Sequence, residues 1–148
     1  MCYRFISISF VAMFALAACS PSGNAIIQNA KQTTLSSGWR VDCNYNQFKA
    51  ENRCFAATFS GSSPFQIVFI NQSGPTIFTP HTFPGRRGTV RVDNGKVRFF
   101  EDAVGIVNDM KVGEKAFVVY HVWPEGERKM IVDITGFSEA YELLLKKR

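Results

Sequence analysis

The feature that most constrains the fold is a pair of alternating runs around an Asn-Gly dipeptide, TVRVDNGKVRFF at residues 89–100. Asn94-Gly95 in this setting predicts a two-residue β-hairpin, because a type I′ turn needs positive φ at both central residues. In that register Arg91 lies opposite Arg98. The same alternation places four apolar side chains on one face, which we expect to point into the core: Val90, Val92, Val97 and Phe99.

Further short apolar runs are separated by turn residues along the rest of the chain. Alternation begins at Trp39, and later runs are dense in β-branched and aromatic residues, as is typical of strands. The predicted strands after the one at Trp39 are Cys54–Phe59, Phe65–Ile70, Ile77-Phe78, and a second hairpin formed by Ala116–Trp123 and Arg128–Thr135.

Two segments have helical spacing instead. Apolar residues recur at helical spacing over Ala103–Met110, and again over Phe137–Lys147, where Ser138 is the predicted N-cap. The second segment has one apolar face, formed by Phe137, Ala140, Tyr141, Leu144 and Leu145. We therefore expect a mainly β fold, a sandwich or barrel-like antiparallel sheet, with a short helix and an amphipathic C-terminal helix.

Residues 1–18 have the parts of an export signal. Arg4 is followed by an apolar run that is shorter than the roughly 20 residues needed to span a bilayer. The last residues before the cysteine, Leu16-Ala17-Ala18-Cys19, resemble the lipobox of bacterial lipoproteins. That resemblance implies cleavage before Cys19, acylation of its sulfur, attachment to the membrane through the acyl chains and, with Ser20 next, an outer-membrane location facing the periplasm or the exterior. An ordinary signal peptide with a chance cysteine is the alternative.

Residues 19–38 are predicted to be a flexible tether. They are rich in Ser, Asn, Gln and Thr, and such a composition buries little apolar surface. Residues 39–148 are then one small domain.

Four cysteines occur in the chain, of which Cys2 leaves with the signal and Cys19 takes lipid. Cys43 and Cys54 remain as an even pair in an oxidising compartment, so we expect them to form a disulfide. A zinc site would need further Cys or His ligands at short spacing, and the only histidines, His81 and His121, stand alone.

The charge is mildly basic, with a formal net charge of +5 for the whole chain. This favours anionic partners such as lipid headgroups or acidic glycans, whereas nucleic acid is not expected in an exported protein's compartment. Guanidinium groups suit phosphate and carboxylate, so four arginines form a candidate anion-binding patch: Arg86, Arg87, Arg91 and Arg98. Nearby acids that neutralise the arginines, or splaying into water, are the alternatives.

No pattern for catalysis is present. The sequence lacks a G-x-S-x-G nucleophile motif, a P-loop, an EF-hand and a dinucleotide fingerprint. We therefore assign no catalytic residue, no metal ligand and no cofactor, and expect a protein that is not an enzyme.

Several stretches resemble the invasion-associated locus B (IalB) family of exported alphaproteobacterial proteins. They are WRVDC at Trp39–Cys43 with Cys54, VRVDNG at 90–95, NDMKVGEKAFVVY at 108–120 and VDITGFSEAY at 132–141. The resemblance implies a surface or periplasmic binding or adhesion module linked to host-cell invasion, and it brings no catalytic residues. The chain departs from the family in lacking a second cysteine pair between Phe99 and Asn108. An inhibitor or immunity lipoprotein against a cell-wall hydrolase is the alternative function.

Overall fold

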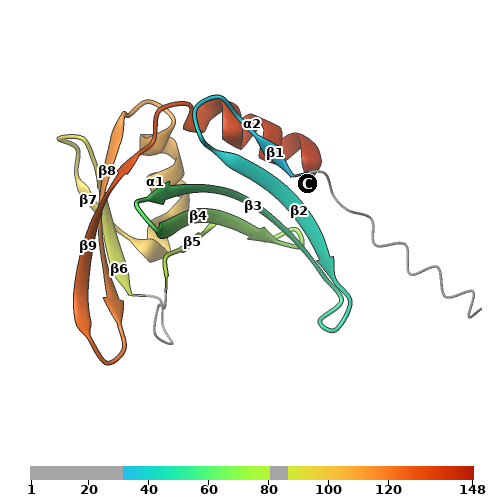
Figure 1. Cartoon of the computed structure of the whole chain (residues 1–148), viewed down its shortest axis with the longest axis horizontal. Coiled ribbons are helices and arrows are strands. Elements are labelled where there is room, and N and C mark those ends of the chain that lie inside the picture. Colours follow the sequence, from blue (N-terminus) through green and yellow to red (C-terminus); the bar gives the residue numbers. More distant parts are fainter. Residues whose placement is uncertain (1–31, 81–86) are drawn as a thin grey trace, which may run out of the picture.

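The structure is a computed structural model that describes residues 32–80 and 87–148. The predictions for the export signal, Cys19, most of the tether, His81 and Arg86 lie outside the described residues. The described part is mainly β, as expected, with two antiparallel sheets and two α-helices (Figure 1).

The first sheet is a five-stranded meander whose spatial order follows the chain. Its strands are β1 (Thr33–Thr34), β2 (Arg40–Asn46), β3 (Glu51–Ser60), β4 (Ser63–Ile70) and β5 (Thr76–Phe78). One row across β2 to β5 consists of Val41, Ala56, Ile67 and Ile77, all directly paired and all buried. Alternation along each strand thus gives this sheet one continuous core face.

The predicted disulfide joins β2 to β3. Cys43 and Cys54 are directly opposite in the antiparallel register, with 4.0 Å between their Cα atoms and an S–S distance of 2.08 Å. Cys54 is buried, whereas Cys43 is half-buried.

The C-terminal helix α2 (Phe137–Lys147) covers the core face of this sheet. The Phe137 ring lies 5.0 Å from Trp39, and the Tyr141 ring lies 6.0 Å from Phe69, measured between ring centroids. These contacts confirm that α2 docks on the sheet through its apolar face.

Two details of this helix differ from expectation. The residue before its first turn is Gly136, in the left-handed region at φ 77°, so Ser138 lies within the helix and not at its N-cap. A Cβ at Gly136 would lie 2.5 Å from the Ser37 side chain, which shows how closely the turn packs. Leu145 is 42% exposed, because Phe137, Ala140 and Leu144 define the buried stripe and Leu145 lies beside it.

The second sheet has four strands in the order β7-β6-β8-β9. They are β6 (Gly88–Val92), β7 (Val97–Phe99), β8 (Lys115–Val122) and β9 (Gly126–Asp133). A single 3₁₀ turn (Phe100–Asp102) leads from β7 into α1 (Ala103–Met110), which packs on the side of this sheet that faces the first sheet (Figure 1).

The register of the β6–β7 hairpin differs from the prediction by one residue. Arg91 pairs with Val97, and Val90 pairs with Arg98, so Arg91 and Arg98 are on opposite faces. The cause lies in Asp93, which has φ 46° and whose carboxylate accepts hydrogen bonds from the Glu114 and Lys115 backbone N–H groups. These bonds hold the turn to the start of β8, and a one-residue shift sends every side chain of β7 to the other face.

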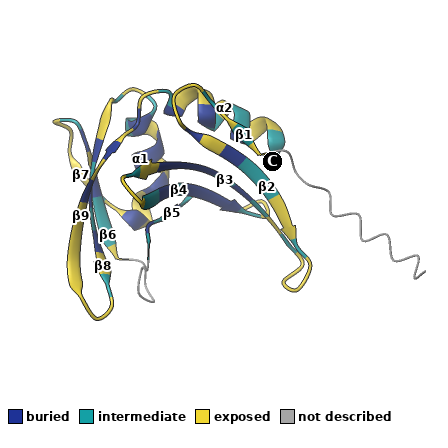
Figure 2. Cartoon of the chain, viewed as in Figure 1, coloured by how far each residue is buried: buried dark blue, intermediate teal, exposed yellow. Residues whose placement is uncertain are grey.

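The core is continuous between the two sheets and the two helices (Figure 2). Val90 and Val92 are buried in it as expected, whereas Val97 and Phe99 are 58% and 66% exposed. Phe100 is buried in their place, at the start of the 3₁₀ turn.

The strand β1 lies within the segment predicted to be tether. Its two threonines pair with Arg40 and Val41 in an antiparallel ladder, and a two-residue strand without an apolar side chain leaves little sign in the sequence. The folded region therefore begins before Trp39. Neither helix within residues 32–80 and 87–148 has both the length and the apolarity required to cross a bilayer.

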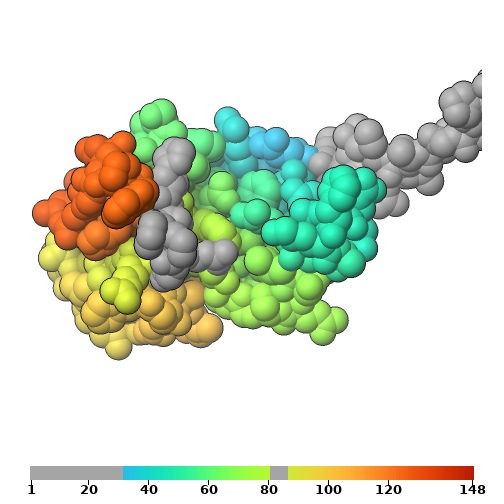
Figure 3. Space-filling view, turned by 90° about the horizontal axis from the view of Figure 1, so that it is seen from below, coloured from blue at the N-terminus to red at the C-terminus, as the bar shows by residue number. Residues whose placement is uncertain are grey.

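The turns of two hairpins mark opposite ends of the molecule. The β2–β3 turn projects beyond the first sheet at one end, and the β8–β9 turn closes the second sheet at the other (Figures 1 and 3).

Candidate functional site: the outer face of the second sheet

The outer face of the second sheet carries most of its exposed apolar side chains. The register places Val97, Arg91, Phe117 and Ile131 in one row across β7, β6, β8 and β9. The next row is Phe99, Thr89, Val119 and Lys129. We call the residues of these two rows, apart from Lys129, the outer sheet face: Thr89, Arg91, Val97, Phe99, Phe117, Val119 and Ile131.

None of the described elements covers the outer sheet face. Helix α2 packs on β2 and β3, and α1 packs on the core side of β6 and β7. Val97, Phe99 and Ile131 are each more than half exposed, and long stretches of β7 and β9 are exposed in Figure 2. Contiguous exposed apolar surface of this kind is typical of an interaction site.

Arg91 lies in the middle of this face. Its guanidinium carbon is 4.8 Å from the centroid of the Phe117 ring, which is the geometry of a cation–π contact. Among the described residues no carboxylate lies within ion-pair distance of it. The ring holds the guanidinium in place while its hydrogen-bond donors remain available to a partner.

A hollow of about 430 Å³ adjoins the outer sheet face near the start of β6. Arg87, Phe99 and Val119 line it together with His121, which pairs with Glu127 across β8 and β9. Its complete lining is Arg87, Gly88, Thr89, Phe99, Glu101, Val119, His121 and Glu127.

This hollow brings together a histidine and two carboxylates, Glu101 and Glu127, which the sequence did not place near one another. All three residues are exposed to water. In the described ranges no group of three His, Cys, Asp or Glu side chains is placed to hold a metal ion.

Arg98 points to the opposite side of the hairpin and binds α1. Its Nε and Nη2 donate to the two oxygens of Asp109 at 2.5 and 3.1 Å, and its Nη1 donates to Asp102 at 2.5 Å. Asp102 is also the N-cap of α1, because it accepts from the Gly105 backbone N–H at 3.1 Å. Arg98 thus ties both ends of α1 to β7.

The charges in this cluster stabilise one another. The hydrogen bond from Arg98 lowers the pKa of the Asp102 carboxyl, and the bonds to Asp109 and Asp102 raise the pKa of the Arg98 guanidinium. A Cβ at Gly105 would lie 2.2 Å from the Arg98 guanidinium, so only glycine leaves space for the cluster. Arg98 is a structural residue that fixes α1.

The predicted four-arginine patch is therefore not assembled as expected. Arg98 is bound by two carboxylates on the core side, and Arg86 lies outside the described residues. Arg91 remains on the outer side of β6, and Arg87, just before β6, lines the hollow beside that face. Two cationic side chains are therefore left, Arg91 within the outer sheet face and Arg87 beside it.

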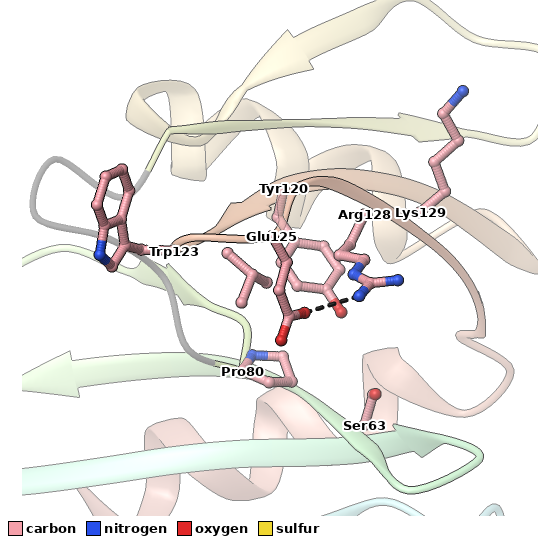
Figure 4. A pocket seen from close by; sticks show the side chains of 8 residues that line it. Ser63, Pro80, Tyr120, Trp123, Glu125, Arg128 and Lys129 are labelled. Atoms are coloured by element: carbon pink, nitrogen blue, oxygen red, sulfur yellow. Dashed lines mark hydrogen bonds and ion pairs between the residues drawn. The ribbon is translucent and has the colours of Figure 1, made fainter.

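A second hollow, of about 490 Å³, lies between the two sheets at the base of the β8–β9 turn (Figure 4). Ser63 and Pro80 line it from the first sheet's side, and Tyr120, Val122, Glu125 and Arg128 from the second. Glu125 and Arg128 form an ion pair of 2.7 Å inside it, whereas Trp123 and Lys129 point away (Figure 4). Because the ion pair satisfies its principal charges, this hollow is the weaker candidate for a binding site.

The sequence contains one sign of the outer sheet face. Phe99 and Phe100 are adjacent, and adjacent strand residues point to opposite faces, so one of the two had to be outside. The Arg98–Asp102 spacing of four residues, with Asp109 about two helical turns further on, was the corresponding sign of the ion-pair cluster.

Comparison with known proteins does not add a relative. No protein-family model, no curated protein and no solved structure matches the chain. The resemblance to the IalB family therefore stays a prediction from short sequence motifs.

Proposed function

We propose that the chain is a non-catalytic bacterial envelope protein, held to the outer membrane by lipid on Cys19, whose domain binds a partner protein through the outer sheet face. The observation that carries this proposal is the exposed apolar face with Arg91 stacked on Phe117 at its middle. A binding or adhesion role is also what the IalB resemblance implies.

The composition of the face fits a protein partner. Aromatic residues and arginine are enriched at protein interfaces, and arginine is among the residues that contribute most to binding energy. A partner with an apolar surface and a carboxylate would cover Val97, Phe99 and Ile131 while pairing with Arg91. The two arginines left from the predicted anion-binding patch would then bind carboxylates at a protein surface.

The anchor is tested by labelling cells that express the full chain with radioactive palmitate. We expect label on the wild type, and on Cys2→Ser as the matched control, because Cys2 is removed with the signal. Cys19→Ser should lose the label and move from the membrane fraction to the soluble fraction. Label that persists in Cys19→Ser, or a wild type without label, would contradict the lipid anchor.

The binding face is tested by a photo-crosslinking amino acid placed in the full chain in its own bacterial cells. At Ile131, which is 57% exposed on the face, we expect one cross-linked species that contains a second protein. At Leu145, 42% exposed on α2, we expect none. Adding Arg91→Ala to the Ile131 variant should lower the yield about tenfold, as loss of a contributing arginine does.

Arg91→Ala should leave the fold intact, since Arg91 is exposed and lies on the far side from the core. Its circular dichroism and melting temperature serve as the control. Equal cross-linking from Ile131 and Leu145, or none from Ile131, would refute the proposed face. A cross-linked species of twice the chain's own mass would show that the partner at this face is a second copy of the chain.

A further inference from the structure

The β2–β3 turn presents a fully exposed aromatic residue. Phe48 is 92% exposed and Tyr45, at the end of β2, is 62% exposed. The Asn46 side chain accepts hydrogen bonds from the Phe48 and Lys49 backbone N–H groups, at 3.0 and 3.2 Å. The turn is therefore a fixed structure that holds Phe48 outward beside the exposed Lys49.

Basic residues surround this end of the molecule. Arg148, at the end of α2, donates from Nε to the Asn71 carbonyl oxygen, and Asn71 is bonded to Asn52 next to the β2–β3 turn. Arg53 of β3 stacks over Phe78 of β5, with 4.9 Å between guanidinium carbon and ring centroid. Lys49 lies in the turn itself, Glu51 begins β3, and Arg53 follows two residues later.

The first described strand runs in the direction that leads away from the β2–β3 turn. β1 runs antiparallel to β2, with Thr33 opposite Val41 and Thr34 opposite Arg40. Moving back along the chain from Thr34 to Thr33 therefore moves along β2 toward Cys43 and the hairpin turn. The opposite end of the molecule carries the β8–β9 turn and its exposed Trp123 (Figures 1 and 3).

The geometry points to the β2–β3 turn as a contact with an anionic phospholipid surface: Phe48 and Tyr45 enter the interfacial layer, and Lys49, with the basic residues around it, binds the headgroup phosphates. Aromatic side chains favour the interfacial layer, and lysine and arginine are attracted to anionic lipid over about a Debye length. This inference rests on the proposed lipid anchor. With the turn on the membrane, the second sheet and its outer sheet face are held away from the bilayer, where a partner has access.

The test uses tryptophan fluorescence of the mature full chain in vesicles of phosphatidylcholine, with or without phosphatidylglycerol, whose acyl chains are brominated. Phe48→Trp is combined with Trp123→Phe, and the wild type is the matched control, since its Trp123 lies at the opposite end and Trp39 is buried. We expect blue-shifted and quenched emission from the variant in phosphatidylglycerol vesicles, and unquenched emission from the wild type.

Adding Lys49→Glu to the Phe48→Trp variant should reduce the quenching, and high salt should do the same, because both weaken attraction to the headgroups. Emission from the Phe48→Trp variant that is not quenched, or equal quenching in the wild type, would overturn the inference. The lipid anchor is decided separately, by the palmitate label on Cys19. If Cys19 carries no palmitate label, the same protein is added to the outside of the vesicles, so that the turn is tested without an anchor. Failure of the protein to bind these vesicles would overturn the proposed contact.

Discussion

Phe137→Ala is expected to lower the free energy of unfolding by about 3–5 kcal/mol, the usual range for removing a buried aromatic ring from a core. Phe137 is fully buried, and its ring packs against both Trp39 and Tyr141. As the first residue of α2, it therefore links the beginning of the helix to the start of β2 and to the next turn of the same helix. Urea denaturation followed by tryptophan fluorescence, with the slope of the transition as a check on two-state behaviour, measures the loss.

The matched control for this substitution is Leu145→Ala on the same helix. Leu145 is 42% exposed, so its removal should cost below about 1 kcal/mol, as surface substitutions do. Because small domains have only about 5–15 kcal/mol of net stability, Phe137→Ala should leave a marginally stable protein. Equal losses for the two variants would show that α2 contributes no core face and would contradict the docking of the helix.

Removing the disulfide is expected to lower the free energy of unfolding by about 3 kcal/mol, the contribution of a bond that closes a short loop on the chain-entropy model. The bond joins residues 11 apart and directly opposite on β2 and β3. The appropriate variant is Cys43→Ala with Cys54→Ala, because a single substitution leaves a free thiol. The change in the urea midpoint of the double variant, compared with the wild type under oxidising conditions, measures the effect.

Reduction supplies an internal control for the disulfide. A reducing agent should bring the wild type to nearly the stability of the double variant, and it should leave the double variant unchanged. A wild type whose midpoint is the same before and after reduction, with loss of the bond shown by mass, would contradict the expected stabilisation.

Local patterns were sufficient to predict most of the elements. The strands from β2 to β9, the helix α1 and the C-terminal helix lie where the alternation and the helical spacing place them. The pairing of Cys43 with Cys54 followed from counting cysteines, and it is present. The physical reason is that strand and helix periods, and the turn residues between them, are properties of neighbouring residues.

The candidate site depended on contacts between residues far apart in the chain. Asp93 binds the start of β8, and this tertiary contact shifts the hairpin register by one residue from the one that Asn94-Gly95 favours alone. The shift turned Val97 and Phe99 outward and Arg98 inward onto α1. A pattern with a period of two specifies which residues share a face, whereas only the packed structure decides which face is buried and which remains for a partner.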